Sequence, residues 1–330
     1  MSVNTFRIER APHGTEHTPH NTTTPGTGTH HPALTTTVPK EFVHRAGVAE
    51  VMLTGWHRKS ENHFGMTAQW PRGHSFFTHV AGHHDPLIAA ETIRQAGALL
   101  AHAEYGVPLG HHFLMSDLSL ATHPAHLLAG STPASLDIDI TCREVKKRRD
   151  TLTGLRYDTV IRRDGHTAAT GSAAFTCTSP TVYRRLRAGR LHNNHPTLPL
   201  TAPTAPQNVG RTSPTDVVLS PTTNPHRWQL RVDTRHPVLF EHPVDHIPGM
   251  MLLEAARQAT TATLGYTTPP LTITGQFTRY AELDTPCHIE THHTPTPTHT
   301  HPHHDTVHIT AHQNNQPLFH STITTTPPTT

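Results

Sequence analysis

Two short segments of this 330-residue chain each place a carboxylate and a guanidinium three residues apart. The first pair is Glu91 and Arg94, and the second is Glu254 and Arg257. A glutamate in a partly buried site has a raised pKa, which suits it to act as a general base near neutral pH. An arginine on the same helix face either orients that glutamate or holds a phosphate with two hydrogen bonds. Both segments are therefore candidates for proton transfer and anion binding.

An ion pair that only stabilises a helix is the competing interpretation, because Glu–Arg pairs at this spacing are common on helices. Duplication within two mostly apolar segments favours function, since a buried charge has to be paired or functional. We expect catalytic roles for Glu91, Glu254 and Arg257, with Arg257 holding a phosphate. For Arg94 we expect a contribution to substrate binding or to the scaffold around Glu91.

Both pairs lie in segments whose apolar residues recur at intervals of three and four, as in a helix with a broad buried face. Asp85 is a good N-cap and Pro86 suits the first helical position, whereas Pro248 and Gly249 precede the second segment. The second glutamate follows the first by 163 residues (254 − 91), about half of the chain. The chain therefore contains an internal repeat.

Strand patterns follow each predicted helix. In the first half, residues 152–178 form two alternating runs around the turn Asp164-Gly165, which predicts a long hairpin. In the second half, residues 307–323 surround the turn Asn314-Asn315 in the same way. One long helix wrapped by an antiparallel sheet is the hot-dog arrangement. We therefore predict an α+β chain with two tandem hot-dog domains that form an internal pseudo-dimer.

Composition sets the expected domain boundaries. Residues 1–39 contain a Thr/His/Pro/Gly tract with almost no large apolar side chains, so we expect a disordered arm there. The first hot-dog domain is expected at 40–187 and the second at 215–325. The Pro/Thr-rich stretch between them, 188–214, is expected to be a linker.

Overall charge argues against partners that are recognised by a strong field. The formal net charge is +2 and charged residues make up 15% of the chain, so we expect neither nucleic acid nor a membrane as partner. No apolar run approaches the roughly 20 residues that span a bilayer. The three cysteines are widely separated, which favours a reducing compartment over a disulfide framework. We expect a cytoplasmic protein.

Several longer motifs occur in a fixed order along roughly residues 40–290. They are Val43-His44-Arg45, Gln69-Trp70-Pro71-Arg72, Asp85-Pro86-Leu87, Phe175 to Pro180, Tyr183 to Arg187, Arg235 to Phe240 and His242 to Met250. This series resembles the A-factor synthase (AfsA) family. Because long motifs recur in the right order, the resemblance is far more specific than any single short pattern.

The resemblance implies an acyltransferase that needs no cofactor. Such an enzyme moves a β-ketoacyl group from acyl carrier protein to a hydroxyl of dihydroxyacetone phosphate, giving the precursor of a γ-butyrolactone-type signalling molecule. By resemblance its functional positions are Glu91, Glu254 and Arg257. The first alternative is a hot-dog thioesterase or dehydratase that acts on carrier-bound acyl thioesters. The second is a non-catalytic ligand-binding or regulatory protein.

The start of the second predicted helix carries further candidates. Backbone N–H groups near Gly249 are expected to form an oxyanion hole. His242 and His246 are expected to bind substrate, with a histidine serving as general acid or base. The alternative is that these histidines shape the start of the helix, with Asp245 as its cap.

Two biased runs have less specific interpretations. Residues 143–149 are strongly basic, and we expect a solvated loop or, alternatively, a docking site for an acidic acyl carrier protein. Residues 291–304 are rich in histidine, as a metal-binding tract would be. The same Thr/Pro bias recurs in residues 13–39, which favours compositional drift in loops. We therefore expect no metal site.

Overall fold

One continuous antiparallel sheet underlies the molecule in this computed structural model. The structure describes residues 35–191, 198–267, 269–294 and 304–327. The chain divides into residues 1–35 and 36–330, and the fold described here belongs to the second unit. Within the described residues, the sheet has 12 strands in the order β1-β2-β4-β5-β6-β3-β9-β12-β11-β10-β8-β7.

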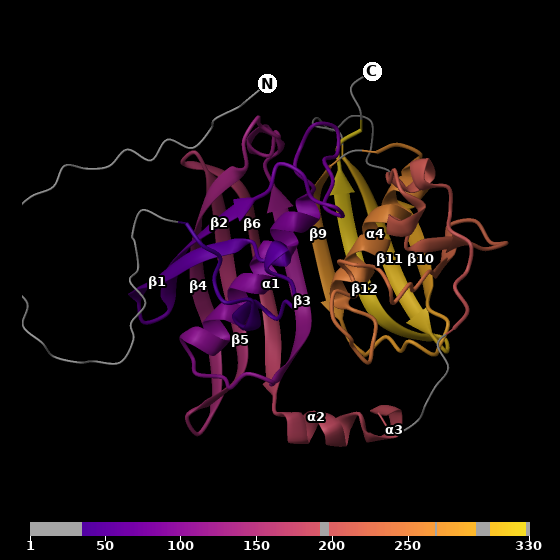
Figure 1. Ribbon diagram of the computed structural model, residues 1–330. Coiled ribbons are helices and arrows are strands. Elements are labelled where there is room, and N and C mark those ends of the chain that lie inside the picture. Colours follow the sequence, from indigo (N-terminus) through magenta and orange to yellow (C-terminus); the bar gives the residue numbers. More distant parts are fainter. Residues whose placement is uncertain (1–34, 192–197, 268, 295–303, 328–330) are drawn as a thin grey trace, which may run out of the picture. The chain divides into compact units, whose positions relative to one another are not determined.

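The strand order is the same in the two halves when it is read outward from the middle of the sheet. The first half contributes β3 (His112–Thr122), β6 (His166–Thr178), β5 (Thr151–Arg163), β4 (Ala134–Arg148), β2 (His63–Trp70) and β1 (Leu53–Ser60). The second half contributes β9 (Pro270–Phe277), β12 (Gln316–Thr325), β11 (Asp305–Gln313), β10 (His288–Thr294), β8 (Arg227–Leu230) and β7 (Leu219–Pro221). The halves join where β3 pairs with β9, with Leu118 opposite Gly275 (Figure 1). This arrangement confirms the predicted α+β pseudo-dimer of hot-dog domains.

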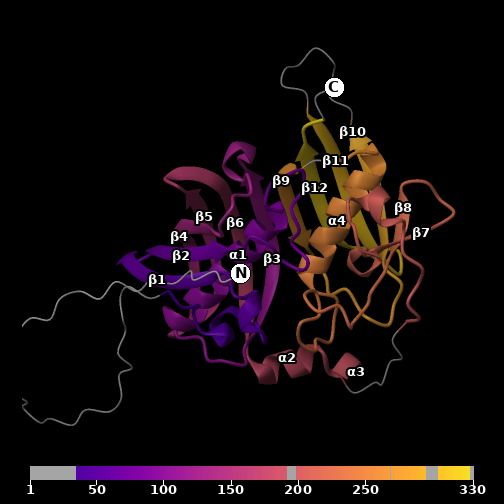
Figure 2. The same cartoon turned by 45° about the horizontal axis from the view of Figure 1, so that its top comes forward.

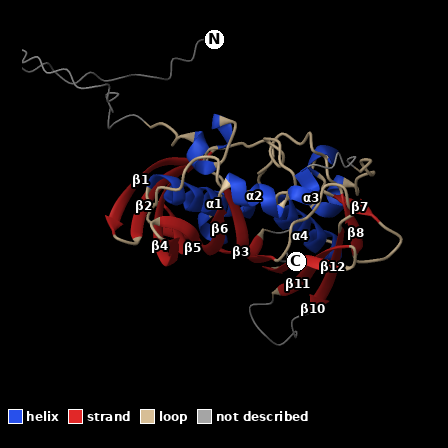
Figure 3. Cartoon of the chain, turned by 90° about the horizontal axis from the view of Figure 1, so that it is seen from below, coloured by secondary structure: helices blue, strands red, loops and turns tan. Residues whose placement is uncertain are grey.

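The two long helices, α1 (Pro86–Ala103) and α4 (Gly249–Leu264), confirm the helical predictions. Figure 3 shows them on the same face of the sheet. Asp85 caps α1 by accepting a hydrogen bond from Leu87 N–H at 2.9 Å. At α4 the N-cap is Pro248, which has no side-chain hydrogen bond, so the alternative that Asp245 caps this helix is wrong. Every helix in the described ranges is too short or too polar to cross a membrane.

A glycine fixes how closely α1 approaches the sheet. Tyr157 of β5 reaches under the helix and donates a hydrogen bond to Ile93 O at 2.7 Å. A Cβ atom on Gly97 would lie 2.4 Å from the Tyr157 hydroxyl oxygen, so a larger residue there would push the helix away. The position of α1 on the sheet, and with it the position of Glu91 and Arg94, depends on this contact.

Two short helices, α2 (Pro180–Leu186) and α3 (Ala188–Leu191), lead from β6 toward the second half (Figures 1 and 2). Five 3-10 helices complete the secondary structure of the described residues: η1 (Lys40–Val43), η2 (Val48–Glu50), η3 (Pro124–His126), η4 (Pro206–Val209) and η5 (Pro214–Asp216). The stretch expected to be a linker, 188–214, thus contains α3 and η4. Residues 1–34 of the expected arm and residues 192–197 lie outside the described residues.

The predicted hairpins are confirmed, and one loop prediction is wrong. Strands β5 and β6 flank Asp164-Gly165, and β11 and β12 flank Asn314-Asn315. Residues 143–148 of the basic run belong to a strand, because β4 continues to Arg148 and pairs with β5 there, and only Arg149 lies in the turn. Its basic side chains tolerate this because they point into solvent from the end of the ribbon. In the histidine-rich run, residues 295–303 lie outside the described residues.

Candidate active site

Glu91 lies at the centre of a buried polar network in the first half. Its Oε1 accepts hydrogen bonds from Arg45 Nε (3.0 Å), Arg94 Nη2 (2.7 Å) and Gln95 Nε2 (2.7 Å). Its Oε2 accepts from Arg94 Nε at 2.9 Å. The carboxylate is therefore surrounded by donors, and two of its partners carry a positive charge.

Glu254 lies at the centre of the same network in the second half. Its Oε1 accepts from Arg211 Nε (2.8 Å), Arg257 Nη2 (2.6 Å) and Gln258 Nε2 (2.5 Å). Its Oε2 accepts from Arg257 Nε at 2.9 Å. The repeat seen in the sequence is thus a repeat of geometry, and it includes one arginine per half that lies far from the helix in the sequence.

The loops that supply these distant arginines are held in equivalent ways. Gln95 donates to Glu50 O at 2.7 Å, and Gln258 donates to Asp216 O at 2.7 Å. Each of these hydrogen bonds ties a long helix to the segment that follows Arg45 or Arg211. The backbone contacts fix where the second guanidinium of each network reaches its glutamate.

A pair of buried histidines identifies another set of equivalent residues. The Nδ1 of His74 accepts hydrogen bonds from the backbone N–H groups of Phe76 and the residue after it. The Nδ1 of His236 accepts from Val238 and the residue after it. Phe76 in the first half therefore corresponds to Val238 in the second.

The network of the second half is sealed by residues of the first half. The Arg211 guanidinium lies 4.3 Å from the centre of the Phe76 ring, and Arg211 Nη1 donates to Phe76 O at 2.6 Å. Asp85 Oδ2 lies 3.9 Å from Arg211 Nη2. As a result, the side chains of Arg211 and Arg257 are only 2% and 3% exposed.

The network of the first half is open because the corresponding positions are occupied differently. Val238 is smaller than Phe76, and Pro248 at the start of α4 has no carboxylate to match that of Asp85. The side chains of Arg45 and Arg94 are accordingly 9% and 21% exposed. This difference between the halves leaves space beside one arginine pair only.

A cavity of about 440 Å³ occupies that space. Its apolar lining comes from both halves and includes Ala98, Phe113, Met115, Phe175, Val238, Val244, Ile247, Met250, Leu253 and Phe277. Its polar lining includes Arg45, Arg94, His44, His112, Tyr183, Glu241, His242, His246, Arg279 and Tyr280, together with Gly249 at the start of α4. An apolar cavity with convergent polar groups is typical of a small-molecule site, and this size suits an acyl chain with a polar head.

The expected raised pKa of the two helix glutamates is wrong. Burial favours the neutral acid, but the charges of Arg45 and Arg94 outweigh it and lower the pKa of Glu91 to about 2. Burial is likewise outweighed by Arg211 and Arg257, and the pKa of Glu254 is also lowered to about 2. Because each carboxylate is ionised and already accepts several hydrogen bonds, neither has the properties of a general base.

The cavity contains some of the predicted site residues and not others. Arg94, His242, His246 and Gly249 line it. Glu91 lies directly behind Arg94 and is 1% exposed. Glu254 and Arg257 are buried in the sealed network and do not contribute to the lining. The predicted catalytic roles of Glu91, Glu254 and Arg257 stay predictions, and the geometry separates the first residue from the other two.

Several residues of the site were not predicted as functional from the sequence, although Arg45 and Tyr183 belong to the motifs named above and Asp245 was considered as a helix cap. Arg45 and Arg211 complete the two networks, although Arg211 falls in the expected linker. Tyr183 lines the cavity, and Asp245 bonds to it. The sequence did contain a signal for these arginines. Arg45 and Arg211 each precede an acidic residue by five positions, so this spacing also repeats between the two halves.

In the described ranges, no group of three or more His, Cys, Asp or Glu side chains is arranged to hold a metal ion. The paired imidazoles of His44 and His102, whose Nε2 atoms lie 2.7 Å apart, both pack against the ring of Phe113, and that of His102 is stacked on it. Burial is the main factor that lowers the pKa of His44 to about 3, so this imidazole is neutral at physiological pH.

Comparison with known proteins agrees with the fold and the repeat. The model of the A-factor biosynthesis hotdog domain matches residues 27–179 and 192–329. The chain is 51% identical over 288 residues to the 2-oxo-3-(phosphooxy)propyl 3-oxoalkanoate synthase of Streptomyces virginiae. The matched region covers 87% of this chain and 96% of that protein. The protein of the same name from Streptomyces coelicolor is 43% identical over 288 residues, covering 87% of this chain and 90% of that protein.

A solved structure shares the fold at low sequence identity. It is a candidate oleoyl thioesterase from Lactobacillus plantarum, with a TM-score of 0.53 and 11% identity, covering 80% of this chain and 96% of that one. At this identity the likeness concerns the fold alone.

Proposed function

The chain belongs to the A-factor biosynthesis hotdog family, and we propose that it acts there as a 2-oxo-3-(phosphooxy)propyl 3-oxoalkanoate synthase. It transfers a β-ketoacyl group from an acyl-carrier-protein thioester to a hydroxyl of dihydroxyacetone phosphate. The product is the precursor of a γ-butyrolactone-type signalling molecule. The observation that carries this proposal is 51% identity to a relative of that name over 87% of this chain and 96% of the relative.

The open arginine pair is suited to the phosphate. Arg45 and Arg94 line the cavity, and Glu91 fixes both guanidiniums from behind. A phosphate is bound well by guanidiniums that are held in a fixed orientation. We therefore assign phosphate binding to Arg94 and Arg45 in place of Arg257, and we assign Glu91 the role of positioning them.

The start of α4 is suited to the thioester carbonyl. Gly249 lines the cavity, and the first N–H groups of a helix have no partner within the helix. A Cβ atom at position 249 would lie 3.1 Å from a ring carbon of Phe277, so glycine suits the close packing here. These N–H groups and the positive end of the helix stabilise an oxyanion that forms on the carbonyl. The apolar walls of the cavity take the acyl chain.

An acyl carrier protein is the proposed donor, and α2 offers a surface for it. Val182 and Leu186 are exposed one helical turn apart, and Arg184 and Arg185 are exposed beside them. Tyr183, which lies between Val182 and Arg184 in the sequence, points inward and lines the cavity. A basic and apolar helix at the mouth of the site is complementary to an acidic partner with an apolar helix face. Delivery of a thioester from such a partner requires a surface of this kind close to the cavity.

The cysteines support a reducing location. Cys142, Cys177 and Cys287 are all free, and burial raises the pKa of the Cys177 and Cys287 thiols to about 12. Free thiols of this kind are typical of a reducing compartment such as the cytoplasm. We therefore propose a cytoplasmic enzyme.

Mass spectrometry of the reaction tests the proposed function. Purified protein is incubated with a β-ketoacyl carrier-protein thioester and dihydroxyacetone phosphate, and we expect the phosphorylated ester and free carrier thiol. Free β-keto acid formed at the same rate without the phosphate co-substrate would contradict the proposal and indicate a thioesterase. An enoyl product would indicate a dehydratase.

A variant of the open arginine pair tests the phosphate assignment. Arg94→Met should raise the KM for dihydroxyacetone phosphate by about 10-fold to 100-fold, because a charge-assisted contact to phosphate contributes about 1.5–3 kcal/mol. The same variant should not change the KM for the thioester. Arg58→Met is the matched control, since Arg58 pairs with Glu104 outside the cavity.

A further inference from the structure

A carboxylate and an imidazole lie next to each other at the edge of the cavity, just before α4. Asp245 Oδ1 and His246 Nδ1 are 2.8 Å apart. His246 lines the cavity and lies two residues before Pro248, the N-cap of α4. The pair is thus adjacent to the N–H groups to which the oxyanion was assigned.

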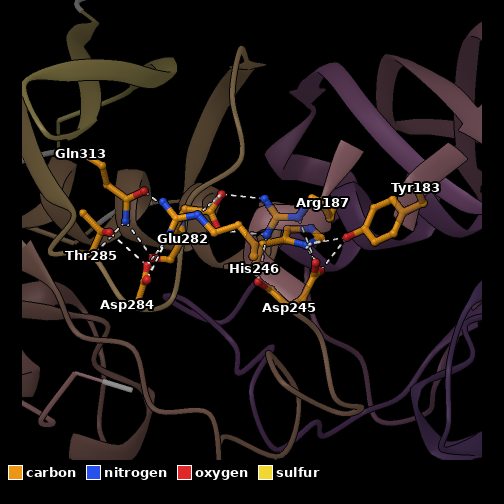
Figure 4. A network of polar contacts seen from close by, with 9 residues as sticks. Tyr183, Arg187, Asp245, His246, Glu282, Asp284, Thr285 and Gln313 are labelled. Carbon is orange, nitrogen blue, oxygen red and sulfur yellow. Dashed lines mark hydrogen bonds and ion pairs between the residues drawn. The ribbon is translucent and has the colours of Figure 1, made fainter. Parts of the chain in front are cut away.

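The Asp245 carboxylate is held in place by residues of α2 and the residue that follows it. Tyr183 donates its hydroxyl to Asp245 Oδ1 at 2.6 Å, and Arg187 Nε donates to Oδ2 at 3.0 Å. Arg187 also donates from Nη2 to the backbone oxygen of Asp245 at 3.1 Å. Figure 4 shows these side chains converging on the carboxylate. Such a carboxylate cannot rotate without losing several hydrogen bonds.

The arginine is itself fixed on its far side. Arg187 Nη1 and Nη2 donate to the two carboxylate oxygens of Glu282, at 2.6 and 2.8 Å. The backbone of Glu282 is held by Gln313 of β11, which accepts from its N–H and donates to its carbonyl, each at 2.8 Å (Figure 4). The support behind Asp245 therefore extends from α2 to the sheet of the second half.

This arrangement determines which nitrogen of His246 carries a proton. Burial opposes ionisation of Asp245, but hydrogen bonds from His246, Tyr183 and Arg187 hold the pKa of its carboxyl well below the usual range. Since an ionised carboxylate only accepts hydrogen bonds, Nδ1 of His246 must be the donor. A neutral imidazole that is protonated on Nδ1 has its lone pair on Nε2. That nitrogen is able to accept a proton.

The hydroxyl of Tyr280, a residue beside His246, is a buried polar group that lacks a hydrogen-bond partner among the described residues. The ring centre of Tyr280 lies 5.0 Å from that of His246. Both residues line the cavity. A buried hydroxyl normally has a partner, so an oxygen of a bound ligand would satisfy this one. This is where an acceptor molecule would bring its oxygen close to His246.

We propose that His246 is the general base of the acyl transfer and that Asp245 and Tyr183 position it. This inference rests on the proposed function. Nε2 of His246 removes the proton from the hydroxyl of dihydroxyacetone phosphate, and the oxygen forms a bond to the thioester carbon. The C–S bond then breaks, and the imidazolium returns the proton to the leaving thiolate. The products are the phosphorylated ester and the carrier thiol.

Three other histidines of the cavity are less suited to this role. His44 contacts the imidazole of His102 through the same Nε2 that a base would use. The ring of His112 is stacked on Tyr183, with 3.6 Å between the ring centres. His242 has a carboxylate partner, since its Nδ1 lies 3.0 Å from Glu241 Oε2. Glu241, however, also accepts from Gly47 N–H and lies near Arg45, on the side of the cavity assigned to the phosphate.

The pH profile of the reaction tests the proposal with His242 as matched control. His246→Gln should lower kcat by at least about 100-fold, because general base catalysis by a positioned histidine contributes about that much or more. The groups that face His246 and titrate or carry charge are Asp245, Tyr183, Tyr280, His112 and Arg187. Wild-type kcat/KM should fall on the acid side as the imidazole is protonated, and His246→Gln should lose this acid limb. His242→Gln should keep it.

Chemical rescue distinguishes a lost base from a disturbed fold. In His246→Gly, added imidazole should raise the residual activity at least about tenfold, whereas the same addition should not change the activity of wild type or Asp245→Asn. Tyr183→Phe should keep the acid limb but lower kcat, as expected of a positioning residue. An acid limb retained in His246→Gln, or lost in His242→Gln, would overturn the assignment.

The result separates this inference from the proposed function. A wild-type protein that makes the phosphorylated ester while His246→Gln makes it at the same rate would disprove the base and leave the function intact. A wild-type protein that makes no ester with both co-substrates present would disprove the function, and the base assignment with it.

Discussion

The two halves of the molecule contain the same buried network, and only one of the networks borders a cavity. In each, a helix glutamate accepts from an arginine three residues on, from a glutamine four residues on and from a distant arginine. The difference lies in what the opposite half presents. Phe76 and Asp85 cover Arg211, while Val238 and Pro248 leave Arg45 and Arg94 accessible. The same ion pairs are therefore sealed from solvent in one half and border a cavity in the other.

The sealed network should have the largest effect on stability when it is broken. Glu254→Gln leaves Arg211 and Arg257 buried without a counter-charge, and removing one partner of a buried ion pair costs about 3–5 kcal/mol. We expect the free energy of unfolding, measured in urea, to fall by about that amount. A variant as stable as wild type would show that water or Asp85 compensates the two guanidiniums.

Breaking the open network should lower the stability of the protein less, and its activity more, than breaking the sealed one. In Glu91→Gln, Arg94 keeps contact with solvent, so we expect a loss of about 1–3 kcal/mol, as for an unsatisfied polar group. Misplacement of Arg45 and Arg94 should lower kcat/KM by up to about 100-fold. Measuring both quantities on Glu91→Gln and Glu254→Gln tests the comparison directly. If activity per folded molecule fell equally in both variants, the second network would also have to act in catalysis.

As pH falls, the contribution of His44 to stability should be lost at a higher pH than the contributions of Glu91 and Glu254. The folded pKa of His44 is lowered to about 3, mainly by burial, so its stabilising contribution is complete above the ordinary value of about 6.5 and is lost as pH falls toward 3. For Glu91 and Glu254, with folded pKa values of about 2, the loss occurs only below about 4.5. We expect His44→Gln to show a smaller decrease in unfolding free energy between pH 7 and 5 than wild type. An equal decrease in the two proteins would indicate that other groups take up the protons.

The smallest effect on stability should come from making the two helix starts alike. Pro248→Asp gives α4 the residue that caps α1, and the backbone there has φ −62° and ψ 143°, close to the −59° and 124° of Asp85. A side-chain cap should raise the free energy of unfolding by about 1 kcal/mol. The new carboxylate should at the same time raise the KM for dihydroxyacetone phosphate, because it repels the phosphate at the open site. A lower KM would show that the phosphate binds elsewhere.

Local patterns in the sequence were sufficient for the fold. The spacing of apolar residues and the cap at Asp85 predicted α1, and the turns at Asp164-Gly165 and Asn314-Asn315 predicted the hairpins. The repeated glutamates placed the helices in two equivalent halves. The end of β4 was missed because its exposed basic residues have no apolar alternation. Elements defined by local physical chemistry were thus predictable, and those without a buried face were less so.

The site depends on contacts that no local pattern contains. The i,i+3 pairs Glu91–Arg94 and Glu254–Arg257 were visible, but the second arginine of each network comes from a loop more than 40 residues away in the sequence. Without those arginines, burial suggested a raised pKa where the structure gives a lowered one. The choice between an open and a sealed site depends on Val238 and Phe76, each of which lies in the half opposite to the network it faces.

Joining the halves in one chain through the β3–β9 pairing has a consequence for how such a site can evolve. In an assembly of two identical subunits, any substitution appears in both sites at once, so a residue that improves one site is imposed on the other. Covalent duplication removes this constraint. Asp85 and Pro248 could diverge, one capping its helix and the other leaving its helix start without a carboxylate, and neither change was copied to its counterpart.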